Sequence, residues 1–230
     1  MDAGDVRRGL VDVAPLLPGI VPFGMVAGIA SVEAGLRLVD AVAMSVVVFA
    51  GASQLAALEL LGSDALLAVV VVTAVVINLR MLMYSASIAP YFRHLSAAWR
   101  AGLAYLLTDQ AYALSIVRYR RDDDVDRRAY YLAVGATLWA TWQVATVAGY
   151  LLGTGIPPAW QLDFAVPLVF LALLVPAVED RPSLVAAVGG GVVAVVGGGL
   201  PLNLGLLVGA AFGIGAGLIA ETVAEGEYGD

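Results

Sequence analysis

Two charged residues lie within otherwise apolar stretches and could bind a polar solute inside a membrane. Arg80 is the only charged residue between Ala65 and Phe92, a run long enough to cross a bilayer, which takes about 20 apolar residues. Asp109 is the only charged residue of the apolar stretch 101–117. A charge at membrane depth costs about 2.5–3.5 kcal/mol even on insertion-based scales, so each residue requires a partner inside the protein.

Arg80 and Asp109 are expected to lie at the same depth. Arg80 lies ten residues before the connection 90–100, and Asp109 follows that connection by nine residues. At about 1.5 Å of rise per residue, both would lie roughly 14 Å from one membrane face. Antiparallel spans joined by a short connection are expected to be neighbours, so we predict an ion pair. Two interpretations remain open: the pair locks two helices together, or it lines a substrate path.

A second polar group interrupts the apolar stretch 38–61. The sequence FAGASQL places Gly51, Ser53 and Gln54 within it, and glycine disfavours a helix by about 1 kcal/mol. A helix break here would expose backbone groups to a ligand, as in transporters with discontinuous helices. The alternative is a small-residue face for helix packing. The G-x-S spacing also fits a serine nucleophile, but His94 is expected in a loop, so no base is available for a hydrolase.

Composition indicates an all-α, polytopic transmembrane helical bundle. The chain is 61% hydrophobic and 13% charged, with a mean hydropathy of +0.90, whereas soluble domains carry about 25% charged residues. The net charge of −7 argues against nucleic acid and against an anionic-lipid patch. With no cysteine and one histidine, we expect no metal site, and no cofactor is predicted.

Hydropathy predicts about eight spans, with seven as the alternative count, in a single transporter domain 1–230. Proline-interrupted spans in both halves of the chain, at Pro15, Pro18 and Pro22 and again at Pro167 and Pro176, are typical of a transporter core. No convincing sequence repeat is visible, so an inverted repeat is left open. The predicted spans are 14–32, 38–61, 65–89, 101–117, 129–152, 164–178, 183–199 and 203–220.

The last predicted span carries glycines at a spacing of four, which places them on one helix face. Such a face lets another helix approach closely, either in this chain or in a partner subunit. These helix-packing residues are Gly205, Gly209, Gly213 and Gly217.

Arginine counting places the N-terminus and a predicted solvated loop, 118–128, in the cytoplasm. Residues 1–13 lack the apolar core of a cleaved signal. With eight spans, the inside segments hold Arg7, Arg8, Arg118, Arg120, Arg121, Arg127, Arg128 and Arg181, and the outside loops hold Arg37, Arg93 and Arg100.

Several blocks of the sequence resemble the AzlC family, the large subunits of branched-chain amino acid exporters. These blocks are PFG (22–24), FAGASQL (49–55), NLRMLMYSASIAP (78–90), LTDQAYAL (107–114), LDFAVPLVFLALLVPAVEDR (162–181) and LPLNLGLLVGAAFGIGAG (200–217). Two positions depart from the family pattern: Met81 stands where relatives commonly have His, and Gln110 stands where they commonly have Glu. Asp109 is then the best remaining candidate for a coupling proton carrier.

The resemblance implies secondary-active export of leucine, isoleucine or valine across the plasma membrane, with a small AzlD-type membrane subunit as partner. Arg80 would bind the substrate carboxylate and Asp109 its ammonium group or a proton. The alternative is a non-transporting assembly or regulatory subunit whose ion pair is only structural; an enzyme is not expected. The predicted substrate-binding set is Arg80, Asp109, Asn78, Gln54, Ser53, Gly51, Phe23 and Tyr84.

Overall fold

The computed structural model describes residues 2–63, 65–122, 124–155, 178, 180–199 and 204–227, and every regular element within them is a helix. The predicted all-α fold class is therefore confirmed. The chain forms two compact units: residues 1–63 with 70–161, and residues 64–69 with 162–230. Apart from Val178, the predicted span 164–178 lies outside the described residues.

Three described helical segments are long and apolar enough to cross a membrane: Ala3–Glu33, Leu67–Phe92 and Arg181–Gly199. The first consists of α1 (Ala3–Val13), the short 3-10 helix η1 (Ala14–Leu16) and α2 (Leu17–Glu33). Pro15 and Pro18 occupy first-turn positions of η1 and α2, where a missing N–H costs little, so the helical path continues through them.

A 29-residue helix, α9 (Arg127–Gly155), lies alongside α1 and α2 and runs in the same direction. Gly9 of α1 meets the N-terminal part of α9 at Tyr130, whereas Gly153, near the C-terminal end of α9, meets α2 at Ile29 and Val32. We call the end of this unit that holds α1 the N-terminal end, and the end that holds Ala34 the opposite end.

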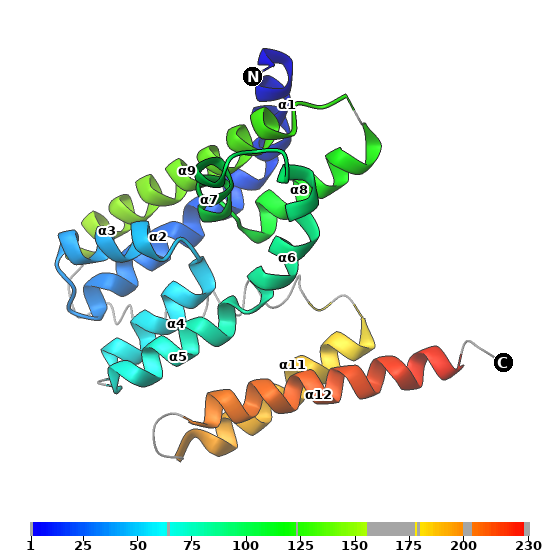
Figure 1. The fold of residues 1–230 in the computed structure, drawn as a ribbon. Helices are drawn as coiled ribbons and strands as arrows, with labels where there is room; N and C mark the ends of the chain where they lie inside the picture. The colour runs from blue at the N-terminus through cyan, green and yellow to red at the C-terminus, as the bar shows by residue number, and fades with distance from the viewer. Residues whose placement is uncertain are drawn as a thin grey trace. The chain divides into compact units, whose positions relative to one another are not determined.

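The segment 38–61 does not cross the unit as predicted. It forms a hairpin of α3 (Leu38–Val47) and α4 (Gly51–Gly62). Helix α3 runs antiparallel to α9, because the Tyr150 hydroxyl donates to Leu36 O (2.9 Å) at its start and Gln143 Nε2 donates to Ser45 O (3.2 Å) near its end. Helix α4 then returns along α2, and Gly62 lies beside Ala34. Both ends of the hairpin therefore lie at the opposite end (Figure 1).

The third predicted span, 65–89, is a crossing that bends at Leu79. It contains α5 (Leu67–Asn78), α6 (Arg80–Ile88) and the 3-10 helix η2 (Ala89–Phe92). Asn78 lies beside the first turn of α4, where its Nδ2 donates to Ser53 Oγ. The Phe92 ring packs edge-on against Tyr131, with ring centroids 5.3 Å apart, so η2 lies near the start of α9 at the N-terminal end.

The fourth predicted span, 101–117, is a second hairpin, which enters from the N-terminal end. Helix α7 (Ala97–Tyr105) starts where Arg128 lies over the Trp99 ring, and Leu106 beyond its end contacts Gly135. Helix α8 (Asp109–Arg121) returns, and the Tyr119 hydroxyl donates to Arg127 O (2.7 Å). The apolar run is thus divided between two helices of opposite direction.

These elements form an inverted arrangement that the sequence left open. A crossing helix (α2) is followed by a hairpin from the opposite end, and a second crossing (α5 and α6) is followed by a hairpin from the N-terminal end (Figure 1). The four hairpin helices contain 9 to 13 residues each. At about 1.5 Å per residue each is roughly 14–20 Å long, about half of a 30 Å hydrocarbon core.

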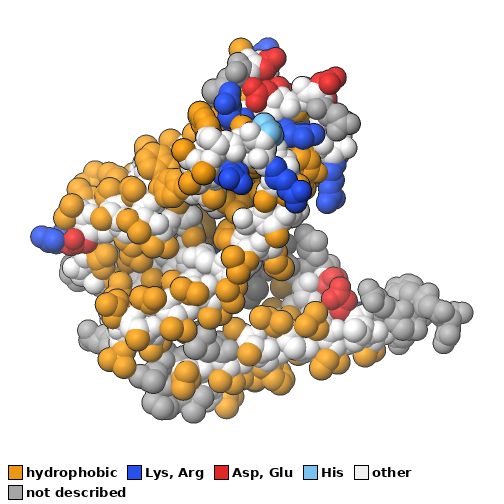
Figure 2. All heavy atoms as spheres, in the orientation of Figure 1, with side chains coloured by type: hydrophobic (Ala, Val, Ile, Leu, Met, Phe, Trp, Pro, Cys, Tyr) orange, Lys and Arg blue, Asp and Glu red, His pale blue; other side chains and the backbone are white. Residues whose placement is uncertain are grey.

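Arginine gathers at the N-terminal end more strongly than predicted. Arg93 and Arg100 were expected on the other face, but Phe92 packs against Tyr119 and Tyr131, and Trp99 packs under Arg128. The reason is the α7–α8 hairpin, which returns the chain to the face from which it came. Figure 2 shows the resulting basic and acidic cluster. The arginines at this end are Arg7, Arg8, Arg93, Arg100, Arg118, Arg120, Arg121, Arg127 and Arg128.

The segment 118–128 is mostly helical rather than a loop. Residues 118–121 form the last turn of α8 and residues 127–128 begin α9, so only 122–126 connect them. Arg118 Nη2 pairs with Asp122 (2.9 Å) and lies 3.9 Å from Asp5 of α1. The N-terminus and this segment therefore lie on one face, as predicted.

The second unit contains α11 (Arg181–Val196), the 3-10 helix η5 (Gly197–Gly199) and α12 (Leu204–Glu227). The predicted glycine face of α12 packs within the chain, against α11. A Cβ at Gly209 would lie 2.7 Å from Gly190 O, and one at Gly213 would lie 2.8 Å from Ala186 O. Gly205 approaches Gly197 and Gly217 approaches Ala186 in the same way, so the two helices pack antiparallel.

Candidate functional site

The tips of the two hairpins, residues 48–50 and 106–108, meet halfway along the first unit. The Tyr105 hydroxyl, next to one tip, donates to Val46 O beside the other tip (2.6 Å) and accepts from Trp139 Nε1 of α9 (2.7 Å). The rings of Phe49 and Tyr105 lie 6.3 Å apart. Two helices, α4 and α8, therefore begin at this level, and their N-termini are positive dipole ends.

The break expected at FAGASQL is present, since α3 ends at Val47 and α4 begins at Gly51. Ser53 and Gln54 in the first turn of α4 are fully buried. Ser53 Oγ donates to Ala50 O (3.0 Å) and accepts from Asn78 Nδ2 (3.0 Å), which joins α4 to the end of α5. Gln54 Oε1 accepts from Trp142 Nε1 of α9 (3.3 Å).

Gly51 lies between two aromatic rings. A Cβ at this position would lie 2.8 Å from the rings of both Phe23 and Trp142, so glycine is the residue that fits. The two rings pack edge to face, with centroids 5.3 Å apart. Phe23 thus lines the start of α4.

Arg80 and Asp109 form the predicted ion pair. Arg80 Nη1 lies 3.0 Å from Asp109 Oδ2, and each side chain is 36% exposed. Each residue is the first of its helix, Arg80 of α6 and Asp109 of α8. A carboxylate is favourable at a helix N-terminus and a guanidinium is not, so Asp109 offsets the unfavourable position of Arg80.

The ion pair joins parallel helices, whereas antiparallel spans were predicted. Tyr112 of α8 lies beside α6, where its hydroxyl donates to Ser87 Oγ (2.9 Å) and its ring stacks on Tyr84 at 4.6 Å. Tyr84 also interacts with the Asp109 carboxylate. The two residues lie at the same depth, as predicted, because each begins a short helix, α6 or α8, that runs to the N-terminal end. The direction was wrong because α7 and α8 fold back at Thr108.

Four buried polar atoms in these residues have no hydrogen-bond partner among the described residues. Two are donors, Gln54 Nε2 and Arg80 Nε, and two are acceptors, Asn78 Oδ1 and Asp109 Oδ1. A buried polar group without a partner costs about 1–3 kcal/mol, and proteins keep few of them. They lie around the starts of α4, α6 and α8, which makes this region the candidate site for a polar ligand.

Sequence reasoning missed the aromatic residues that hold this site. Trp142 positions Gln54, Trp139 and Tyr105 join the hairpin tips, and Tyr112 stacks on Tyr84. Trp139 and Trp142 lie three residues apart in the apolar span 129–152, which places them on one helix face. A buried indole N–H requires an acceptor, and this requirement could have indicated from the sequence that the two tryptophans contact polar residues.

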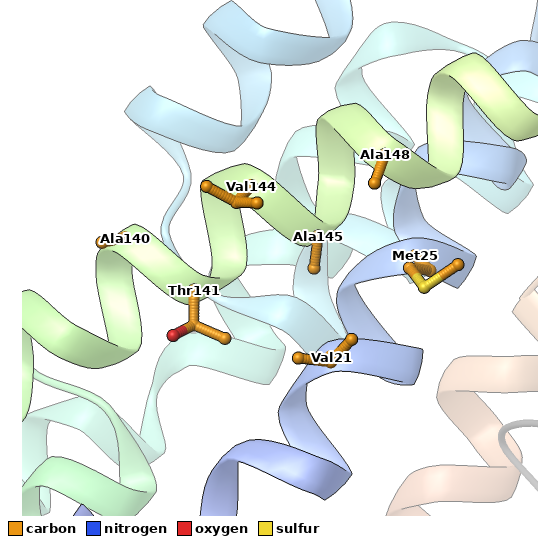
Figure 3. Close-up of a pocket in the computed structure, with 7 residues that line it drawn as sticks. All are labelled: Val21, Met25, Ala140, Thr141, Val144, Ala145 and Ala148. Carbon is orange, nitrogen blue, oxygen red and sulfur yellow. The ribbon is translucent and has the colours of Figure 1, made fainter. Parts of the chain in front are cut away.

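A groove of about 370 Å³ between α2 and α9 is separate from the predicted site residues (Figure 3). Figure 3 shows that its side chains are apolar except for the hydroxyl of Thr141. It therefore has no group suited to a charged solute. The lining residues are Val21, Met25, Ala140, Thr141, Val144, Ala145 and Ala148.

The protein is a helical membrane protein by its structure: it has apolar helices long enough to span a bilayer, hairpins of half that length, and charged residues gathered at one end of the first unit. The chain belongs to the AzlC family: the family model for AzlC protein matches residues 15–156, from η1 through α9. This range contains every predicted substrate-binding residue. No solved structure matches the chain.

Relatives of similar length are also named as membrane proteins. An uncharacterized membrane protein of Archaeoglobus fulgidus is 30% identical over 196 residues, which cover 82% of each chain. The inner membrane protein YgaZ of Escherichia coli is 23% identical over 183 residues, 77% of this chain and 75% of that one. An uncharacterized membrane protein of Helicobacter pylori is 28% identical over 160 residues, 69% of each chain.

Proposed function

We propose that the protein is a secondary-active exporter of branched-chain amino acids that works with a small AzlD-type membrane subunit. The observation that carries this proposal is the set of unpaired atoms at the starts of α4, α6 and α8. An amino acid zwitterion needs donors for its carboxylate and acceptors for its ammonium group. Gln54 Nε2 and Arg80 Nε are the free donors, and Asn78 Oδ1 and Asp109 Oδ1 are the free acceptors.

The surroundings of these atoms suit an apolar substrate side chain. Phe23 and Trp142 pack together on the α4 side, and Tyr84 and Tyr112 stack on the α6 and α8 side. Aromatic rings supply large apolar contact surfaces, which favours leucine, isoleucine and valine over polar amino acids.

We assign the coupling proton to Asp109. It is the one carboxylate in the polar set, and its Oδ1 atom is free to accept a proton or an ammonium group. An acidic residue inside a membrane protein is typical of proton relays. We propose a transporter rather than an enzyme, because the Ser53 hydroxyl donates to Ala50 O and is used within the start of α4.

We place the protein in the plasma membrane with its N-terminal end in the cytoplasm. Nine arginines gather at that end of the first unit, whereas Arg37 lies at the opposite end beside Asp40. Positively charged connections are retained on the cytoplasmic face.

Efflux of labelled leucine, measured in cells that also contain an AzlD-type subunit, tests the proposal. Arg80→Ala and Asp109→Asn should each lower the efflux rate at least about tenfold, the loss expected when a charged contact is removed. The matched control is Arg37→Ala, which removes an exposed arginine from an i,i+3 pair with Asp40 and should leave efflux unchanged. Wild-type efflux from both site variants would contradict the proposal.

The competing function is an assembly or regulatory subunit whose ion pair is only structural. The double variant Arg80→Asp with Asp109→Arg restores the pair with reversed charges. A structural pair predicts recovery of full function, whereas a zwitterion site predicts continued loss, because the reversed charges would face the wrong ends of the substrate.

A further inference from the structure

Helix α4 begins inside the protein without a capping side chain. Its N-cap residue Ala50 is extended and makes no side-chain hydrogen bond to the first turn. The backbone N–H groups of Gly51, Ala52 and Ser53 have no acceptor among the described residues. First-turn N–H groups of a 12-residue helix, with the positive end of its dipole, are suited to an anion.

A fully buried side chain adds a further donor at the same turn. Gln54 has an exposed fraction of zero, and its Nε2 has no partner. The orientation of this amide is set by Trp142, whose Nε1 donates to Gln54 Oε1 and whose ring lies against Gly51. Because the oxygen is held by Trp142, the nitrogen remains available at the start of α4.

The other two helix starts at this level are less suited to an anion. The first turn of α8 is capped by Thr108, which accepts from Ala111 N (3.2 Å), and carries the negative charge of Asp109. Arg80 at the start of α6 already pairs with that carboxylate at 3.0 Å. The start of α4 therefore has donors without a counter-charge, and the start of α8 has the anion.

We propose that the start of α4, with the first-turn amides and Gln54, binds the substrate carboxylate, while Asp109 and Asn78 receive the ammonium group. This assignment rests on the proposed transport of amino acids. Arg80 then acts as the counter-ion of Asp109 rather than as the carboxylate clamp. Trp142 is a positioning residue that holds the Gln54 amide.

Asn78 connects the two subsites, because its Nδ2 reaches the first turn of α4 while its Oδ1 is without a partner among the described residues. Asn78 donates to Ser53 Oγ in the first turn of α4. Arg80 begins α6 two residues after Asn78 ends α5, and it holds Asp109 at 3.0 Å. The absence of a Cβ at Gly51 lets the rings of Phe23 and Trp142 pack directly against the helix start.

Binding of leucine and of leucinamide, which lacks the carboxylate, tests this assignment. Ligand-induced stabilisation of the purified full-length protein is measured as a titration. Wild-type protein should bind leucine more tightly than leucinamide, roughly 10- to 100-fold. Gln54→Glu should reverse this preference, because a glutamate repels the carboxylate and tolerates the neutral amide. A protein that had merely lost its fold would bind neither ligand.

Two further variants separate the subsites. Gln110→Glu, the same change beside Asp109 on α8, should retain the preference for leucine. Trp142→Phe keeps the ring but loses the N–H donor, and it should weaken leucine binding while leaving leucinamide binding unchanged. The proposal would be overturned if Gln54→Glu still preferred leucine while Arg80→Met lost that preference. Those results would assign the substrate carboxylate to Arg80. Failure of the wild-type protein to bind or export leucine would instead overturn the proposed function, and this assignment with it.

Discussion

At the scale of single residues, one aspartate joins the N-terminus to the start of α9. Asp126 Oδ1 accepts from Ala129 N (3.0 Å) and caps α9, and Oδ2 accepts from Asp2 N (3.1 Å). In return, Asp126 N donates to Asp5 Oδ2 (2.8 Å). Burial alone would raise the pKa of Asp126, but the backbone donors Ala129 and Asp2 outweigh it, so the pKa lies below its ordinary value.

The lowered pKa predicts how α1 docking depends on pH. A carboxyl group whose pKa is lower in the folded state stabilises that state above its unfolded pKa, about 3.9, and the stabilisation is lost as the pH falls through the folded value. Asp126→Ala should lower thermal stability at pH 7 by about 1 kcal/mol, the usual cost of losing a helix cap. The deficit should shrink below about pH 4.

Thermal unfolding of the detergent-solubilised protein at several pH values measures this effect. Asp124→Ala is the matched control: Asp124 is exposed in the same connection, and its hydrogen bond to Asp122 uses its backbone N–H, which alanine keeps. An equal deficit at pH 7 and at pH 3 would contradict the proposed role of the charged carboxyl group.

At the scale of elements, α2 and α9 approach closely along two glycine motifs that we did not predict. The contact between the two helices includes Gly24 and Gly28 of α2 and Gly149 and Gly153 of α9. A Cβ on Gly28 would overlap Thr146 O, and one on Gly149 would overlap Met25 O. Both pairs have the four-residue spacing recognised in the last span, so the same pattern would have located this contact.

Gly149→Ala should therefore destabilise the first unit. The added methyl group meets backbone rather than a movable side chain, so the cost should reach the upper part of the 1–3 kcal/mol range for overpacking. Gly102→Ala in α7 is the control, because a Cβ there meets nothing within 4 Å and alanine favours a helix by about 1 kcal/mol. Thermal unfolding of both variants measures the difference. Equal stability of the two would contradict the packing.

At the scale of the whole molecule, the hairpins determine which connections share a membrane face. Arg37 and Ser63 flank the α3–α4 hairpin and should lie on one face, whereas Ser96 and Asp124 should lie on the other. If 38–61 crossed the membrane, Arg37 and Ser63 would lie on opposite faces. The chain contains no cysteine, so single cysteines can be introduced without background labelling.

Labelling of intact cells and inverted vesicles with a membrane-impermeant thiol reagent tests this arrangement. Arg37→Cys and Ser63→Cys should react from the same side, and Ser96→Cys and Asp124→Cys should react from the opposite side. Reaction of Arg37→Cys and Ser63→Cys from different sides would restore the eight-span topology and contradict the hairpin. With the N-terminal end cytoplasmic, the first pair should react in intact cells.

Much of the site was predictable because burial of charge in a membrane permits few solutions. Arg80 and Asp109 are each the single charge of an apolar stretch and lie at matching depth, so an ion pair between them could be predicted. The break at Gly51 followed from glycine beside Ser53 and Gln54 within an apolar run. Trp142 and Tyr105 could not be assigned in this way, because an aromatic residue in an apolar span fits lipid, core and site equally.

The sequence by itself determined an all-α membrane protein, its apolar segments, the polar residues at depth and the clustering of arginine. Only the tertiary structure decided which apolar segments cross. The 24 residues of 38–61 suit one helix across a bilayer or two helices of half that length, and hydropathy is the same for both. Packing against α2 and α9 selects the hairpin, because Gly51 must fit between Phe23 and Trp142 while Gly62 returns to Ala34. That choice brings the starts of α4 and α8 to the same level and assembles the polar site between them.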